Sequence, residues 1–320
     1  MLMLAGLMGA ILVGAAIDFT SEDDEIVGFH DDTLDVDAEP TAVSMDNVRA
    51  DSAEDDSNAS EDIATEDGEP DEAIERQDGT AFADLLMGDA ENDEIHGHEG
   101  DDDLRGGGGD DTIFGGAGDD WIQGDGSFDA AGNDSIDGGD GDDSLAGQGG
   151  DDTLLGGRGD DTLLGGDGDD VLDGGEGDDW ISGQAGNDTL IAGAGSDDLD
   201  GGEGNDLLIG DDDADTDWLH GGEGDDTLMP GAYDFAEGGA GADTFVLTAG
   251  GSVPEIGDFD SREDIIRIDL ADPDAPEPEV DLHVDHDGSL LIRLDGHAVG
   301  RITNGAAVSL DNIVIHRPTA

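Results

Sequence analysis

The chain has 320 residues, of which 87 are Asp or Glu and 9 are basic, so its formal net charge is −78. This balance excludes electrostatic binding to nucleic acid or to an anionic membrane surface, because both require a basic contact surface. Cysteine is absent, which excludes disulfides and thiolate metal sites, and only 4% of the residues are aromatic, too few for the core of an ordinary enzyme of this length. The fold therefore needs a counter-charge that its own side chains do not supply.

The chain begins with an apolar run, Met1–Ile17, that carries no charge and ends at Asp18. A helix of this length would span about 25 Å, slightly less than a hydrocarbon core of about 30 Å. No basic residue precedes the run, so the positive start of a secretory signal is missing. We expect either a retained membrane anchor or an export segment that is removed. Both interpretations imply that the rest of the chain leaves the cytoplasm.

The next segment, residues 18–78, is rich in Asp and Glu with Ser, Ala and Thr between them. Low hydrophobicity combined with charge of one sign predicts a disordered, self-repelling spacer. The segment is too short and too polar to hold a catalytic domain, and we assign no activity to it.

A nine-residue unit repeats from Gly79 to Val246. Its pattern is G-G-x-G-x-D-x-U-x, where U is a large aliphatic residue, and residues 174–182 (GGEGDDWIS) are a well-preserved copy. Two units carry extra residues, at 124–137 and 210–220, and an irregular stretch, 230–237, precedes the last unit. Six residues of turn and three of strand account for the pattern, because Gly permits positive φ at the bend and the middle strand residue faces inward.

The sixth residue of each unit is Asp, which supplies a hard carboxylate oxygen at every turn. Asp and carbonyl oxygens without a soft donor form the ligand set of Ca²⁺, which takes six to eight oxygens. Zn²⁺ would require His or Cys in each unit, and neither recurs. A solvated acidic linker without metal would not keep an aliphatic residue at every ninth position. The pattern therefore predicts multiple calcium ions and folding that is coupled to calcium binding.

This unit resembles the calcium-binding nonapeptide of the repeats-in-toxin (RTX, haemolysin-type) family. The resemblance covers Gly79–Val246 and implies an all-β fold, a right-handed parallel β-roll in which two units make one coil. It also implies that ions lie between neighbouring coils, held by sixth-position Asp carboxylates and backbone carbonyls. The ligands carried over on this resemblance are Asp102, Asp111, Asp120, Asp134, Asp143, Asp152, Asp161, Asp170, Asp179, Asp188, Asp197, Asp206, Asp217 and Asp226. Asp84, Asp93 and Asp243 hold the same position at the ends of the array.

The last segment, residues 247–320, departs from the repeat and predicts a small β domain that closes the roll. Asp287-Gly288 and Asp295-Gly296 are signals for hairpin turns. Its start resembles the C-terminal export domain of type I secreted proteins. Strands are expected at Ile266–Leu270, Leu290–Leu294, Ala298–Ile302 and Ile313–Ile315.

Trp121, Trp180 and Trp218 each precede the inward residue of their unit, so they are expected to point outward. All three belong to odd-numbered units, which places them on one face if two units make a coil. With strands about 4.8 Å apart, they would stand about 14 Å and 10 Å from one another. Exposed Trp side chains in a line can stack on sugar rings or form adhesive contacts. The opposing interpretation is that the seventh position tolerates bulky residues and that the shared parity is chance.

No catalytic motif accompanies the repeats. His96 and His98 lack the H-E-x-x-H spacing of metalloproteases, and no G-x-S-x-G sequence occurs. We therefore predict a non-enzymatic, secreted or surface-tethered calcium-binding protein with a structural, adhesive or matrix role. The expected partners are calcium ions and a surface polysaccharide or matrix, with a membrane tether through Met1–Ile17 as a further option and no nucleic acid. The alternative is a secreted RTX-type hydrolase or toxin relative in which the roll assists export.

Overall fold

The computed structural model describes residues 75–126, 131–210, 215–248, 253–272, 276–303 and 308–317. The predicted apolar segment, residues 1–17, and the predicted spacer up to residue 74 lie outside these ranges. The described residues are all β apart from one short 3-10 helix, η1 (Leu310–Asn312). None of their helices has the length and hydropathy needed to cross a membrane.

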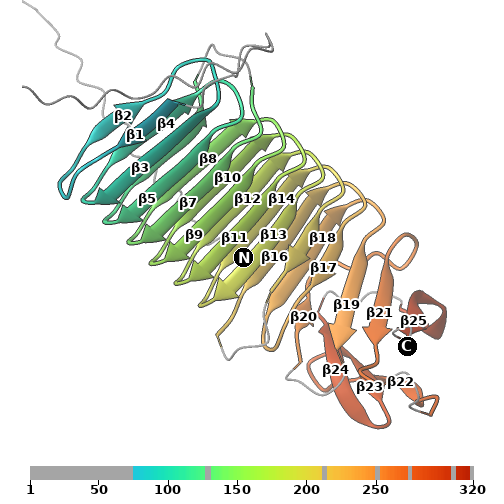
Figure 1. The fold of residues 1–320 in the computed structure, drawn as a ribbon. Helices are drawn as coiled ribbons and strands as arrows, with labels where there is room; N and C mark the ends of the chain where they lie inside the picture. Colours follow the sequence, from blue (N-terminus) through green and yellow to red (C-terminus); the bar gives the residue numbers. More distant parts are fainter. Residues whose placement is uncertain are drawn as a thin grey trace, which may run out of the picture. The chain divides into compact units, whose positions relative to one another are not determined.

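Successive strands alternate between two sheets and stack into a parallel β-solenoid (Figure 1). The odd sheet has 12 strands: β1 (Glu75–Asp78), β3 (Asp93–Glu99), β5 (Thr112–Ala117), β7 (Ser135–Asp140), β9 (Thr153–Arg158), β11 (Val171–Glu176), β13 (Thr189–Ala194), β15 (Leu207–Ile209), β17 (Thr227–Met229), β19 (Thr244–Thr248), β21 (Ile265–Asp269) and β25 (Ile313–His316). The even sheet has 13 strands: β2 (Leu85–Met87), β4 (Asp103–Gly107), β6 (Trp121–Asp125), β8 (Ser144–Gly149), β10 (Thr162–Asp167), β12 (Trp180–Ala185), β14 (Asp198–Glu203), β16 (Trp218–Glu223), β18 (Phe235–Ala240), β20 (Glu255–Ile256), β22 (Val280–Val284), β23 (Leu290–Leu294) and β24 (His297–Ile302). The predicted all-β parallel roll is thereby confirmed.

The register between neighbouring strands follows the nine-residue unit. Leu163 of β10 pairs with Ile181 of β12, so an uninterrupted coil contains two units. Both insertions leave this register intact: Ile113 still pairs with Ile136 across the first, and Leu199 with Leu219 across the second. The insertions therefore do not displace the strands on either side of them.

The core is a single column of aliphatic side chains between the two sheets. The middle residue of each short strand segment points inward because alternate strand residues face opposite sides, and these residues are 0–1% exposed. They are Ile95, Leu104, Ile113, Ile122, Ile136, Leu145, Leu154, Leu163, Leu172, Ile181, Leu190, Leu199, Leu208, Leu219 and Leu228. In these strands, one large apolar side chain defines which face of the strand is buried.

The stretch 230–237, irregular in the sequence, forms a half-coil that lacks one residue. Its Phe235 pairs with Trp218 and its Ala236 with Leu219, in register with the preceding coil. Ala236 occupies the inward position and is fully buried. The small side chain at this position hides the repeat from sequence inspection, although the backbone continues the solenoid.

The strands after residue 247 extend the two sheets and do not form a sheet of their own. β20 and β21 add in parallel to β18 and β19, and β24 and β25 add in parallel to β20 and β21. Among the residues that the structure describes, antiparallel pairing occurs only within β22, β23 and β24, through the two predicted hairpin turns. Both residues of one turn, Asp295 and Gly296, have positive φ, as a type I′ turn requires. At the other end the first strand starts at Glu75, four residues before the expected boundary of the repeats at Gly79.

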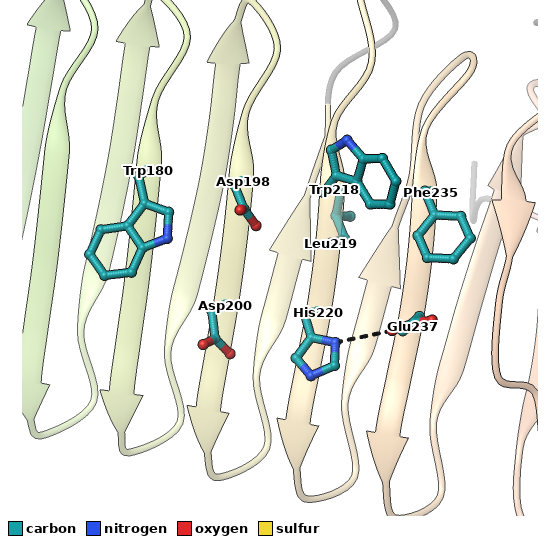
Figure 2. Close-up of a pocket in the computed structure, with 8 residues that line it drawn as sticks. All are labelled: Trp180, Asp198, Asp200, Trp218, Leu219, His220, Phe235 and Glu237. Atoms are coloured by element: carbon teal, nitrogen blue, oxygen red, sulfur yellow. Dashed lines mark ion pairs between the residues drawn. The ribbon is translucent and has the colours of Figure 1, made fainter. Parts of the chain in front are cut away.

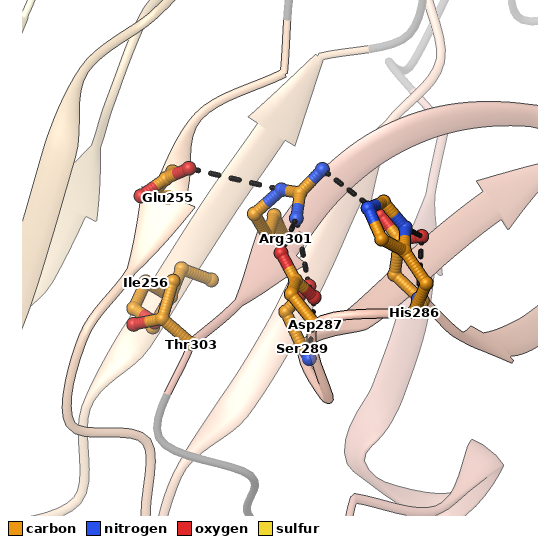
Figure 3. Close-up of polar contacts among 8 residues, drawn as sticks. Glu255, Ile256, His286, Asp287, Ser289, Arg301 and Thr303 are labelled. Carbon is orange, nitrogen blue, oxygen red and sulfur yellow. Dashed lines mark hydrogen bonds and ion pairs between the residues drawn. The ribbon is translucent and has the colours of Figure 1, made fainter.

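The antiparallel strands are fastened to the solenoid by Arg301 (Figure 3). Its Nη1 donates to Ser289 Oγ at 2.7 Å and lies 3.1 Å from Asp287 Oδ2. Its Nη2 lies 3.4 Å from Asp285 Oδ2, and its Nε lies 3.7 Å from Glu255 Oε1 on β20. One guanidinium, only 24% exposed, therefore connects the β22–β23 hairpin with a solenoid strand.

Candidate metal centre

The sixth-position Asp residues of the repeats are buried at the turns, immediately before each strand. Those from Asp93 to Asp243 are only 0–3% exposed, and this set includes every Asp that the sequence marks as a ligand. Asp84, in the first unit, is half-buried. Carboxylates are rarely so deeply buried unless they are paired or bind a metal.

From Asp102 onward, one oxygen of each of these carboxylates accepts a hydrogen bond from the preceding coil. Asp161 Oδ1 accepts from the Asp143 N–H at 2.7 Å, and Asp179 Oδ1 accepts from the Asp161 N–H at 2.8 Å. The same bond recurs along both edges of the solenoid, from the Asp84 N–H to Asp102 Oδ1 at one end and from the Asp243 N–H to Asp264 Oδ1 at the other. These ladders hold each side chain in one orientation relative to the next coil.

The second oxygen of twelve interior carboxylates has no hydrogen-bond partner among the described residues. The atoms concerned are Oδ2 of Asp102, Asp111, Asp120, Asp134, Asp143, Asp152, Asp161, Asp170, Asp179, Asp188, Asp206 and Asp226. Each faces the first Gly of its unit: a Cβ added to Gly156 would collide with Asp161 Oδ2 and with the carbonyl oxygen of Gly174. The first Gly thus lets a carboxylate oxygen and a carbonyl oxygen approach its Cα closely, which a residue with a Cβ would prevent.

Burial raises the pKa of these carboxyl groups. The pKa of Asp134 rises to about 8, that of Asp152 to about 7 and that of Asp170 to about 6. Removal from water is the main cause, the backbone N–H bond opposes it, and neighbouring carboxylates add to the rise. A cation at the unpartnered oxygens would reverse this shift by favouring the charged form.

The donors at each turn fit a hard cation bound largely by oxygens of the backbone. Within the described ranges, no three His, Cys, Asp or Glu side chains gather as a metal centre. Twelve interior turns offer a carboxylate oxygen without a hydrogen-bond partner and a nearby carbonyl oxygen, with no sulfur and no recurring imidazole. This set suits Ca²⁺, which accepts carbonyl oxygens readily, and does not suit Zn²⁺.

Comparison with known protein families agrees with this donor chemistry. The RTX calcium-binding nonapeptide repeat matches residues 78–113, 99–130, 128–163, 146–181, 155–190, 164–199, 182–216 and 213–232. Residues 78–232 are RTX calcium-binding nonapeptide repeats. Repeats of this kind bind Ca²⁺ at multiple sites, so the predicted calcium-binding repeat protein is confirmed.

Solved structures provide two further similarities, whereas curated proteins give no match. The chain is similar to the AlgE6R3 subunit of the Azotobacter vinelandii mannuronan C5-epimerase, with 25% identity over 50% of this chain and 80% of that chain and a TM-score of 0.24. It is also similar to the extracellular lipase LipA from Serratia marcescens, with 18% identity over 76% of this chain and a TM-score of 0.21. The match spans 40% of the lipase chain.

At the ends of the RTX array, the second oxygen of the turn carboxylate also accepts a hydrogen bond from a backbone N–H. At the start, Oδ2 of Asp84 accepts from the Thr80 N–H at 2.6 Å, and Oδ2 of Asp93 accepts from the Asp89 N–H at 2.9 Å. At the finish, Oδ2 of Asp234 accepts from the Gly231 N–H and Oδ2 of Asp264 from the Asp260 N–H, both at 2.6 Å. The unpartnered oxygens are thus confined to interior coils.

Asp234 and Asp264 were missed by the sequence analysis. Asp234 was overlooked because its half-coil is one residue short and has Ala236 in place of a large aliphatic residue. Asp264 is followed by Ile265, Ile266 and Arg267, which fit the D-x-U-x part of the unit, so a signal for it existed.

A second ladder, formed by the fifth position of the RTX units, was also missed. The N–H of Asp169 donates to Asp151 Oδ1 and that of Asp178 donates to Asp160 Oδ1, both at 3.0 Å. Here the side chain accepts from the following coil, the reverse of the sixth-position ladder, and it remains exposed. The recurrence of Asp or Asn before the invariant Asp is the signal that identifies this ladder.

The three Trp side chains lie on the same face of the RTX roll. Trp121, Trp180 and Trp218 belong to β6, β12 and β16 of the even sheet and are 39%, 43% and 55% exposed. Trp121 is in register with Trp180 through Ser144 and Thr162, and Trp180 with Trp218 through Asp198. Three and two strand steps of about 4.8 Å correspond to the expected separations of about 14 Å and 10 Å.

Proposed function

We propose that the sixth-position Asp residues from Asp102 to Asp226 are the calcium ligands and that the roll folds when calcium occupies their turns. The observation that carries this proposal is the buried carboxylate oxygen without a hydrogen-bond partner, which recurs in the interior coils. An unpartnered buried charge is among the most unfavourable groups a fold can contain. Its repetition along two edges is explained if a cation completes each turn.

The chain's own residues prepare these turns for the ion. The backbone N–H of the preceding coil fixes one carboxylate oxygen, as the Asp152 N–H does for Asp170 at 2.8 Å, which directs the other oxygen into the turn. The first Gly of the unit lacks the Cβ that would collide with this second oxygen, as at Gly165 beside Asp170. Bound calcium would supply positive charge between carboxylates that otherwise repel one another.

This chemistry supports a role outside the cell. Extracellular calcium modules have affinities of about 10⁻⁴–10⁻³ M, so the roll would stay unfolded where calcium is scarce and fold after export. RTX repeat proteins are typically secreted, and the charge of −78 suits a chain that is extended before folding. We assign the folded roll a structural, adhesive or matrix role, with attachment through Met1–Ile17 as a further proposal.

We place the protein among non-catalytic RTX proteins, since the repeats and the strands that close them account for the described residues. The alternative is a secreted RTX-type hydrolase or toxin relative. Hydrolase assays on culture fluid distinguish the two, and turnover that survives removal of the roll would contradict the non-catalytic assignment.

A calcium titration followed by circular dichroism tests the proposal directly. Protein freed of calcium by dialysis should gain β signal in one concerted transition in the sub-millimolar to millimolar range, and a chelator should reverse it. Mg²⁺ at equal concentration serves as the control, because it demands a smaller octahedral site. Equal compactness and protease resistance in excess chelator at neutral pH would overturn the proposal.

A further inference from the structure

A shallow groove of about 470 Å³ lies on the outer face of the even sheet (Figure 2). We call it the tryptophan groove; it is lined by Trp180, Asp198, Asp200, Trp218, Phe235 and Glu237, among others. Figure 2 shows Asp198 and Asp200 along β14, between Trp180 on β12 and Trp218 on β16. Two indoles therefore flank a pair of carboxylates.

The strand register fixes this arrangement. Trp180, Asp198 and Trp218 are directly paired across three neighbouring strands, so the two indoles are about 10 Å apart with a carboxylate between them. Asp200 is two residues along β14 from Asp198 and faces the same side. Phe235 contacts Trp218 with 4.9 Å between ring centroids, which extends the apolar wall.

The same face already binds a guanidinium in this way, using the chain's own Arg105. Its Cζ lies 4.8 Å from the centroid of the Trp121 ring. Its Nε and Nη2 donate to Asp103 Oδ1 and Oδ2, each at 3.0 Å. Asp103 of β4 is paired with Trp121 of β6, so Trp and Asp on adjacent strands hold an Arg side chain between them.

The tryptophan groove has the same Trp–Asp pair on both sides of β14. Asp200 stands at the position that corresponds to Arg105, two residues after the paired Asp. Asp198 is paired with Trp180 on one side and with Trp218 on the other. Among the described residues, those that line the groove include His220 but no Arg. His220 Nδ1 is 3.6 Å from Glu237 Oε2, on the strands beyond Asp198.

We propose that the tryptophan groove binds guanidinium or alkylammonium side chains from a basic segment of a partner protein. A cation over an indole face is attracted by the ring, and the flanking carboxylates supply ionic hydrogen bonds. The net charge of −78 attracts basic partners and repels anionic ones, which disfavours an acidic polysaccharide. This inference rests on the proposed calcium-dependent folding and gives the adhesive role a partner of stated chemistry.

Fluorescence of the groove tryptophans provides the test. The chain has three Trp residues, so the variant Trp121→Ala leaves Trp180 and Trp218 as the only indole reporters. With millimolar calcium and physiological salt, a tetra-arginine peptide should change the emission saturably. A tetra-citrulline peptide of nearly the same shape but without charge should not.

Matched variants separate the groove from the overall charge. Asp198→Asn with Asp200→Asn should weaken binding of the arginine peptide about tenfold, the scale of a lost charge pair beside an aromatic ring. Asp137→Asn with Asp173→Asn makes the same charge change on β7 and β11 of the odd sheet, and should alter binding less than about twofold. Trp218→Ala should act like the groove double variant.

Two outcomes would overturn the inference while leaving the calcium proposal intact. The first is a calcium-folded protein whose affinity for the arginine peptide falls equally in both double variants. The second is saturable binding of cellohexaose at Trp180 and Trp218 without binding of the arginine peptide, which would assign the groove to neutral sugar. Failure to gain β signal with calcium would instead overturn the proposed function, and this inference with it.

Discussion

Acidification should replace calcium in stabilising the roll. Burial raises the pKa of the twelve interior carboxyls with an unpartnered oxygen in the folded, calcium-free chain, to about 8 for Asp134 and about 6 for Asp170, from an ordinary value of 3.8. For each group, the folded state therefore binds more protons than the unfolded state at pH values between the ordinary pKa of 3.8 and the raised pKa. The stability that this proton uptake contributes is fully present below the pKa of the unfolded state, and it is lost as the pH rises through the pKa of the folded state. Lowering the pH from about 8 to about 5 should favour the folded calcium-free roll.

The size of the effect follows from the number of carboxyls that take up protons. Each contributes up to about 1.4 kcal/mol per pH unit between its unfolded and folded pKa, less whatever water at the turns screens. Asp170 would contribute about 1.4 kcal/mol between pH 6 and pH 5, and Asp134 would contribute over the whole range down from about pH 8. Since interior coils on both edges carry such groups, the changes add, and acid should shift the calcium-free chain towards the folded roll.

The assay is circular dichroism, with urea unfolding, of protein from which calcium has been removed by a chelating resin. Asp170→Asn should reduce the pH slope by one proton, about 1.4 kcal/mol per pH unit below pH 6. Asp169→Asn is the matched control, because hydrogen bonds from Asn187 lower the pKa of Asp169 and keep it out of this range. With calcium present the dependence should reverse, since the ligands must be deprotonated. Loss of β signal on acidification of the calcium-free protein would refute the reasoning.

With calcium present at neutral pH, Asp170→Asn should weaken calcium binding about tenfold at the adjoining turns, whereas Asp169→Asn should leave the titration midpoint unchanged; equal midpoints would remove Asp170 from the ligand set. Gly204→Ala should cost about 3 kcal/mol or more in urea unfolding, because Gly204 has φ +141° and a Cβ there would collide with a backbone carbonyl of the preceding coil. Gly288→Ala, at φ +93° with open space around it, should cost only about 1 kcal/mol, and similar losses in the two variants would argue against close stacking of the coils. Arg301→Ala should speed amide hydrogen exchange in β22–β24 and destabilise these strands by about 1–2 kcal/mol, with no change in the central coils. Uniform exchange rates along the chain would contradict that role.

The regular repeats could be predicted from the sequence because each unit contains the residues that specify its own turn and strand. Gly at the bend, Asp at the sixth position and one large aliphatic residue in the strand specify a turn, a carboxylate and an inward side chain within nine residues. Two units per coil then give the face of any outward residue by counting, which is why the shared face of Trp121, Trp180 and Trp218 could be predicted. The pattern was not recognised where a unit was shortened, as at Asp234.

The ends of the solenoid could not be read in this way. Asp84 and Asp264 each have a carboxylate at the same position of the turn as Asp170. In both, however, the second oxygen accepts a hydrogen bond from a nearby backbone N–H. The C-terminal strands were expected as a small β domain that closes the roll, and the structure adds how they do so: β20 and β21 continue the two sheets, because the last coils present edges that need partners.

The sequence by itself determined the coil, its core and the carboxylates at the turns, because all three are written into every nine residues. Only the tertiary structure decided which carboxylate oxygens lack a donor, where the array is closed, and that Asp198 and Asp200 lie between Trp180 and Trp218. The physical reason is that these features arise from contacts between coils, where residues about 18 positions apart meet across neighbouring strands.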